Sequence, residues 1–274
     1  MDLQIGQVLN PSYGLGMVAL SFLIACAGSF VALLCARRMF RADGQLDWAM
    51  AVGGAIALGG IGIWSMHFIG MVAYSLPVRV SYDIALTAIS LIAAIGISGL
   101  ALYLAGRGGT RFSLQGWAAG SVLAGLGVCV MHYMGMFAMN MRATMEFDGA
   151  RVLLSVAIAI TAAAAALWLA FNLRKVSHQA AAAVVMGVAV CSMHYVGMSA
   201  ATMICTAAAP ANAFTIGGSF LGLMVFGVAG AVLLVIGYVM SERSIDDAAH
   251  SSEKPDTLFG RMAAATTRAR LQSH

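Results

Sequence analysis

The sequence contains the stretch GIGIWSMHFIGM at residues 60–71, and the second half of that stretch returns twice. The copies are VMHYMGM at 130–136 and SMHYVGM at 192–198, so the shared pattern is M-H-[FY]-x-G-M. The histidines of the three copies lie 65 and 62 positions apart. That spacing leaves room for two membrane-spanning helices in each copy, so the pattern predicts a repeat of helical hairpins.

The composition excludes several classes of protein. Of the 274 residues, 61% are hydrophobic and 9% are charged, and the mean hydropathy is +0.89. A soluble domain carries about 25% charged residues. A soluble globular enzyme, a disordered chain and a nucleic-acid binder are therefore excluded, and the long apolar runs indicate a polytopic helical membrane protein in a lipid bilayer.

Seven apolar segments are long enough to cross a bilayer, which needs about 20 residues per helix. They lie at about 13–36, 48–75, 83–105, 114–139, 150–173, 179–204 and 214–240. The predicted fold is all-α, with three two-helix repeats plus one extra helix. We predict a membrane domain over 1–240 and a cytoplasmic tail over 241–274, disordered or interfacial. A tail of about 34 residues cannot form a stable core, so neither a soluble catalytic domain nor an enzyme is expected.

Basic residues in the loops predict the orientation. The loops after the first, third and fifth spans contain seven of them, Arg37, Arg38, Arg41, Arg107, Arg111, Arg174 and Lys175. The opposite loops contain three, Arg79, Arg142 and Arg151. Because the more basic side faces the cytoplasm, we predict that the N-terminus lies outside and the C-terminus inside.

Helical periodicity places the motif residues on one face. Positions −7, −3, +3 and +4 relative to each histidine share its face at 3.6 residues per turn. That face presents Gly, then Trp or Cys, then His, Gly and Met. All three motif helices run in the same direction, so the histidines are expected at one depth, near the outer face.

Three imidazoles and up to six thioethers at one depth form a candidate metal site. Its residues are His67, His132, His194, Met66, Met71, Met131, Met136, Met193 and Met198. Imidazole is the commonest metal ligand, thioethers favour Cu(I), and the motif contains no carboxylate for a hard cation. Copper is therefore the first candidate, and haem or zinc are the alternatives. Packing of polar side chains without a metal is a further alternative.

Other polar residues near the motif have simpler interpretations. Cys129 and Cys191 lie three residues before their histidines, where the first copy has Trp64. They fit buried thiols better than extra ligands. Asp83 and Asp148 each follow a motif histidine by sixteen residues and begin a predicted span, so they are predicted helix N-caps.

The triple motif resembles the MHYT domain, a bacterial integral-membrane sensor module, over about residues 8–240. The resemblance implies a multi-pass protein of the bacterial inner membrane. It also implies sensing of a diatomic gas (O2, CO or NO) or of redox state through a metal, suggested to be copper, on the nine residues given above. The threonine of the family motif is replaced here by Ile69, Met134 and Val196, so a chemical role for threonine is not expected.

Many members of that family continue into a cyclic-di-GMP enzyme domain, a histidine kinase or a DNA-binding domain. This chain resembles a stand-alone form, which would need a separate cytoplasmic or membrane signalling partner. Two alternatives to the sensor stay open, namely copper handling or insertion for a membrane metalloenzyme and a haem or quinone membrane oxidoreductase. Solute transport fits less well, because the spans hold few charges.

Overall fold

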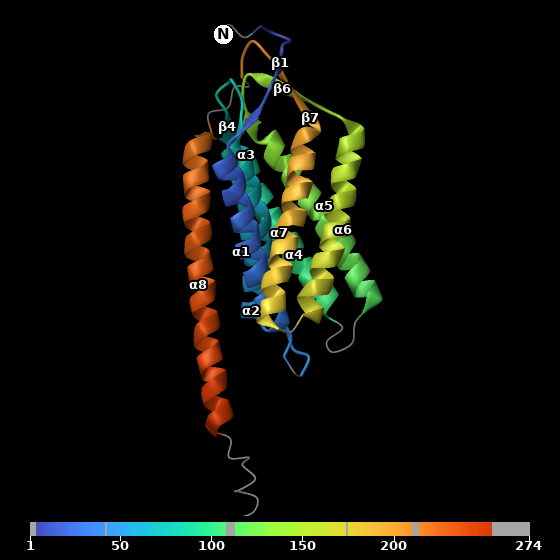
Figure 1. The fold of residues 1–274 in the computed structure, drawn as a ribbon, viewed down its shortest axis with the longest axis vertical. Helices are drawn as coiled ribbons and strands as arrows, with labels where there is room; N and C mark the ends of the chain where they lie inside the picture. Colours follow the sequence, from blue (N-terminus) through green and yellow to red (C-terminus); the bar gives the residue numbers. More distant parts are fainter. Residues whose placement is uncertain (1–3, 42, 108–112, 174, 210–213, 254–274) are drawn as a thin grey trace, which may run out of the picture. The chain divides into compact units, whose positions relative to one another are not determined.

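Seven helices in the described part of the chain are long and apolar enough to cross a membrane, as predicted (Figure 1). The computed structural model describes residues 4–41, 43–107, 113–173, 175–209 and 214–253, with side chains up to residue 242. Arg111, Arg174 and residues 254–274 of the predicted tail lie outside the described residues. The spans are α1 (Leu15–Arg37), a continuous second span of α2 (Trp48–Ala55), η1 (Ile56–Ser65) and α3 (Met66–Ala73), then α4 (Ile84–Gly106), α5 (Leu114–Phe137), α6 (Gly149–Asn172), α7 (Val176–Ser199) and α8 (Gly218–Glu253).

Several predicted span ends are wrong, because those residues form short strands instead of helix. The strands that follow the motif helices are β3 (Tyr74–Ser75), β5 (Met139–Asn140) and β7 (Ala201–Cys205), and β8 (Thr215–Gly217) precedes α8. Hydropathy does not separate an apolar strand from the last turn of an apolar helix, so the predictions 48–75, 114–139 and 179–204 end too late. The prediction 214–240 begins too early, and α8 continues past its end, through Glu253. The sixth span also begins earlier than predicted, at Val176.

A two-stranded ladder closes each hairpin at its motif end. Strand β2 (Ser12–Tyr13) pairs with β3, β4 (Ser81–Asp83) with β5, and β6 (Ala143–Phe147) with β7, all antiparallel. Strand β1 (Val8–Leu9) adds to β7, and β8 adds to β4. These ladders satisfy backbone polar groups where the chain leaves the helices, which matters beside an apolar solvent.

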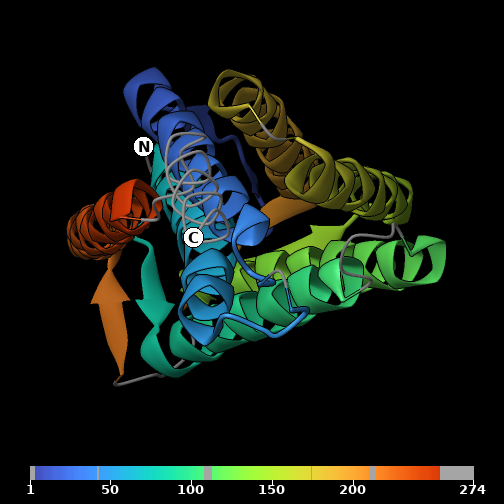
Figure 2. The same cartoon turned by 90° about the horizontal axis from the view of Figure 1, so that it is seen from below.

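The six helices of the three hairpins pack around a central line (Figure 2). In each hairpin the first span (α1, α4 or α6) packs against the motif span that follows it. The first span also packs against the motif span of a neighbouring hairpin. Thus α1 packs on α7, α4 on η1, and α6 on α5. The motif helices α3, α5 and α7 contact one another within this ring. The chain divides into two units, and all of these elements belong to the first, Met1–Leu233.

Aspartate side chains cap α4 and α6, the helices that start the second and third hairpins, as predicted. Asp83 Oδ1 accepts a hydrogen bond from the backbone N–H of Leu86 at 2.8 Å. Asp148 Oδ1 accepts from Ala150 and Arg151 at 2.9 and 3.2 Å. Such caps satisfy backbone donors that a helix start leaves free.

The second span differs from the other motif spans by a π-helical segment, Ile56–Ser65. The N-cap Asp47 lies 20 residues before His67, whereas Ser113 and Lys175 each lie 19 residues before their histidines. A π-helix bonds i to i+5 and therefore absorbs an additional residue without turning the helix that follows. The segment is closely packed, since a Cβ on Gly28 of α1 would collide with the backbone of Gly62.

Deleting one residue from this segment tests its role as an insertion. We expect deletion of Ile56 to leave a regular α-helix that still presents His67 inward, at a cost of about 1 kcal/mol. The matched deletion of Leu123 in α5, which has no extra residue, turns the preceding half-helix by about 100° relative to His132 and should cost at least about 3 kcal/mol. Thermal unfolding in detergent measures both, and equal losses would contradict the insertion.

Candidate metal centre

The structure brings the three motif histidines into mutual contact between α3, α5 and α7. Their side chains are 0–1% exposed. His67 Nδ1 lies 3.0 Å from His194 Nδ1 and 3.1 Å from His132 Nδ1. The ring centroids are 4.9–5.2 Å apart, and one ligand nitrogen from each ring lies within 4.8 Å of the others. The helices α3, α5 and α7 end five or six residues after their histidines, so the cluster lies close to the strand ladders.

The second nitrogen of each ring points at a motif glycine of another copy. A Cβ on Gly135 would overlap Nε2 of His67, one on Gly197 would overlap Nε2 of His132, and one on Gly70 would overlap Nε2 of His194. The contacts therefore run in a closed cycle through the three copies. This explains the glycine at position +3, because only a residue without Cβ leaves room for the neighbouring imidazole.

Hydrogen bonding alone leaves this cluster unsatisfied. The Nδ1 atom of a neutral imidazole has either one proton or one lone pair, so His67 Nδ1 cannot bond well with both neighbours. Within the described residues, none of the three Nε2 atoms has a hydrogen-bond partner. Buried polar nitrogens without partners are costly, particularly in a membrane. A small cation between the three Nδ1 atoms would engage their lone pairs, while each Nε2–H would still face a motif glycine.

Two of the Nδ1 separations are close to those that such a cation requires. A metal about 2.0–2.1 Å from each of three nitrogens holds those nitrogens roughly 3.5 Å apart. The two Nδ1 distances of 3.0 and 3.1 Å come close to this separation. The residues present can therefore accommodate a small metal ion through Nδ1, with Nε2 left protonated against the glycines.

All six motif methionines are buried, with at most 2% of the side chain exposed. Met66 packs with Ala25 and Cys191, while Met193 packs with Ala159 and Cys129. In these two copies, the methionine before the histidine thus packs beside the cysteine that lies three residues before the histidine of another copy. Among the described His, Cys, Asp and Glu residues, the three histidines are the only cluster compact enough to hold one metal ion. Cys129 and Cys191 therefore pack as apolar thiols.

A hydroxyl layer surrounds the histidines and was missed in the sequence. Tyr133 and Tyr195, directly after their histidines, share hydrogen bonds with Ser155 and Ser21 at 2.8 and 3.0 Å. The equivalent Ser90 accepts from Trp64 Nε1 at 2.9 Å, because the first copy has phenylalanine in place of tyrosine. Trp64 at position −3 therefore compensates for the missing hydroxyl.

A signal for this layer does exist in α1, α4 and α6, the first helix of each hairpin. They contain SFLIA at 21–25, SLIAA at 90–94 and SVAIA at 155–159, a Ser-x-x-x-Ala pattern. The three alanines are 0–4% exposed, and Ala25 and Ala159 pack on the methionines before His67 and His194. Aligning the hairpins over both helices would have found these positions.

Phenol groups lie between the histidine layer and the strand end. Tyr13 makes edge-to-face contacts with Tyr74 and Tyr195 at centroid distances of 5.4 and 5.7 Å. Burial, and then the charge that Tyr13 would carry, raises the pKa of Tyr74 to about 12. Burial likewise raises the pKa of Tyr82. These two phenols therefore stay neutral across the physiological pH range.

The comparisons with known proteins agree with the repeat. The model for MHYT, described as a bacterial signalling protein N-terminal repeat, matches residues 60–116 and 125–183. The chain belongs to the MHYT family. It is a membrane signalling domain, and its seven apolar helices make it a multi-pass membrane protein.

The MHYT relatives are longer signalling proteins. The chain is 43% identical over 199 residues to the bifunctional diguanylate cyclase/cyclic di-GMP phosphodiesterase MucR of Pseudomonas aeruginosa, covering 71% of this chain and 29% of MucR. It is 35% identical over 217 residues to the cyclic di-GMP phosphodiesterase NbdA of the same species, covering 75% and 27%. It is 32% identical over 205 residues to the signalling protein YkoW of Bacillus subtilis, covering 71% and 25%.

The chain thus spans less than a third of the length of each of these relatives. No solved structure matches it.

Substituting a motif glycine tests the cyclic contact between copies. We expect Gly135→Ala to destabilise the protein by about 1–3 kcal/mol, because the added Cβ overlaps His67 Nε2. Gly96→Ala in α4 is the control, since a Cβ there meets nothing within 4 Å and should be neutral. Thermal unfolding in detergent measures the difference. An unchanged Gly135→Ala protein would mean that the imidazole does not occupy this position.

Proposed function

We propose that this MHYT domain is a sensor that holds one copper ion at His67, His132 and His194 and detects a diatomic gas or a redox change there. The observation that supports this most is the close approach of three buried Nδ1 atoms, because His67 Nδ1 cannot share a single proton or lone pair with both of its neighbours. Copper held by imidazole supplies a redox-active centre with affinity for O2, CO or NO. The excess of basic residues in the opposite loops supports placement of this centre near the outer face of the bacterial inner membrane.

Copper is the best match in this proposal, and the spacing of the rings disfavours haem. Ring centroids 4.9–5.2 Å apart leave no space for a porphyrin between the imidazoles. Zinc suits three imidazoles equally well but has no redox chemistry. Six buried thioethers in the same motifs favour a softer ion than zinc, with Met66, Met71, Met131, Met136, Met193 and Met198 as candidate additional ligands.

The contacts around the rings suggest how occupancy changes the fold. Each imidazole lies directly against a glycine of a different hairpin, so a ring cannot move without shifting a neighbouring helix. A ligand shifts the equilibrium only if it binds two arrangements of these helices differently. The close packing between copies makes discrete arrangements more plausible than a continuous deformation.

A signalling partner completes this proposal. The names of MucR and NbdA describe cyclic di-GMP synthesis or hydrolysis. By this relationship, we propose that the domain described here regulates a cytoplasmic or membrane signalling partner, in the same chain or in a separate one.

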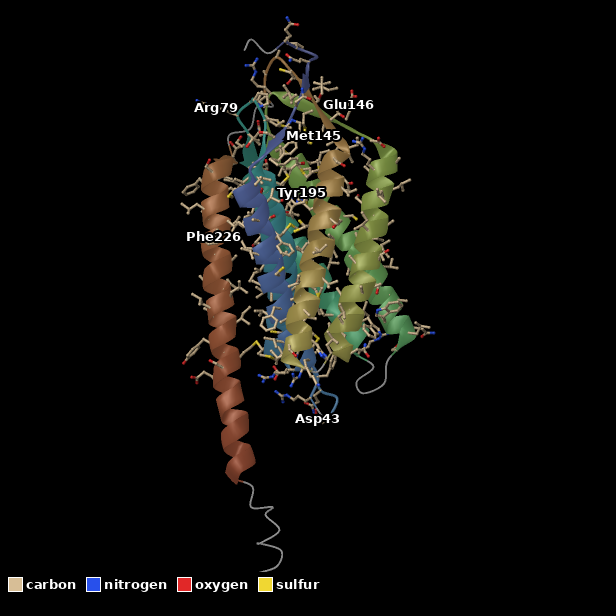
Figure 3. The ribbon with its side chains drawn as sticks, viewed as in Figure 1. Asp43, Arg79, Met145, Glu146, Tyr195 and Phe226 are labelled. Carbon is tan, nitrogen blue, oxygen red and sulfur yellow. The ribbon has the colours of Figure 1, made fainter. Side chains whose placement is uncertain are left out.

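Copper handling is a second candidate, and methionines at the strand end favour it. Met145 on β6 lies opposite Met203 on β7, and Figure 3 shows Met145 at the end of the six-helix ring opposite Asp43. Met139, Met141 and Met203 are 1–7% exposed. Thioethers at this end would offer soft ligands to a copper ion on its way to or from the histidines.

Metal content tests the proposal. We expect protein purified in mild detergent and loaded with copper to retain about one equivalent, because three nitrogens at one point form one site. The triple variant His67→Ala/His132→Ala/His194→Ala should lose it while remaining folded, as judged by its elution and helical circular dichroism. A matched control is His178→Ala, at the far end of α7 from the cluster.

Three outcomes would overturn the proposal. Failure of the native protein to bind any metal after reconstitution would leave the histidines as polar packing. A haem spectrum in purified protein would instead favour the oxidoreductase. Release of copper to an acceptor protein without any response to gas would favour copper handling over sensing.

A further inference from the structure

A cavity of about 50 Å³ lies inside the bundle on the side of the histidines away from the strands. All six helices of the ring contribute to its wall. Val128 and Ala124 line it four and eight residues before His132, and Val190 and Met186 line it four and eight residues before His194. These positions lie one and two turns from the histidines on the same helix face. Met193, the residue before His194, also lines the cavity, so the cavity reaches the underside of the imidazole layer.

The wall of this cavity is almost entirely apolar. It consists of alanine, valine, leucine, isoleucine and methionine side chains, with Ser98 as the exception. A void lined in this way stays dry and accepts apolar guests such as xenon. A volume of about 50 Å³ suits an atom or molecule of gas size.

A smaller void and a wall of small side chains lie between the cavity and its surroundings. A smaller void of about 10 Å³ shares Ile63, Ala124 and Val128 with it and reaches Met131, the residue before His132. On the opposite side, the wall is formed by Ala162, Ala163 and Ala166 of α6, which are only half-buried. Small side chains thus separate the cavity from the surface of α6 that faces the bilayer.

We propose that this cavity binds small uncharged gas molecules and delivers them from the bilayer to the underside of the histidine centre. Apolar gases partition from water into hydrocarbon, so the lipid is their natural source. Gas binding in the cavity requires no metal. Only the delivery step rests on the proposed sensor function.

Xenon tests the cavity directly. We expect crystals of the full chain, grown in lipid and pressurised with xenon, to show an anomalous peak between α5, α6 and α7. Ala124→Leu and Ala162→Leu fill the space and should remove the peak. Ala165→Leu is the matched control, because Ala165 is exposed on the same helix and does not line the cavity, and it should keep the peak.

Nitric oxide binding to the copper-loaded protein tests delivery. We expect Ala124→Leu to slow the association rate several-fold with an unchanged copper content, and Ala165→Leu to leave it unchanged. No xenon peak in the native crystals, or an equal peak in the filled variants, would overturn the cavity as a gas site. An unchanged association rate in Ala124→Leu would overturn delivery. Xenon binding in a protein that takes up no copper would leave the cavity standing while the sensor function fails.

Discussion

The contact between each motif imidazole and the motif glycine of another copy fixes how closely the three central helices approach. His67 meets Gly135, His132 meets Gly197 and His194 meets Gly70, so removing any copy would open the cycle. Packing of small residues is the main means by which helices associate in a membrane, where burial from water gives no advantage. Here the small residues accommodate polar rings, so the same contacts assemble the bundle and gather three buried imidazoles whose Nδ1 atoms meet one another.

The first copy departs from the other two, and its departures are related. Trp64 takes the place of a cysteine, its indole N–H bonds Ser90, and Phe68 accordingly needs no hydroxyl. The second span also holds the π-helical segment. Of an 18-residue apolar stretch of this span, 89% of the residues are buried, a larger share than in any other described span. π-Helical turns are frequent at functional sites. Three equivalent hairpins would give the proposed sensor no preferred direction for a response, whereas one distinct span would provide it.

Much of this arrangement follows from the sequence, and the rest depends on contacts between copies. Apolar length predicted the seven spans, and periodicity placed His67, His132 and His194 on equivalent faces. The caps at Asp83 and Asp148 followed from side-chain chemistry. The strand Ala201–Cys205 was missed because its apolar residues also suit a helix. The extra residue of the second span was hidden because helix starts were unknown, and the serine layer because only the motif helices were aligned.

The claim that matters most is that three imidazoles meet at a single metal. X-ray absorption at the copper edge of the loaded protein tests it most directly, because imidazole rings give a characteristic outer-shell scattering that thioethers and water do not. We expect scattering from three imidazoles in the native protein and from two in each single His→Ala variant that retains copper. Copper bound only by sulfur or oxygen, or an unchanged imidazole signal in all three single variants, would contradict it.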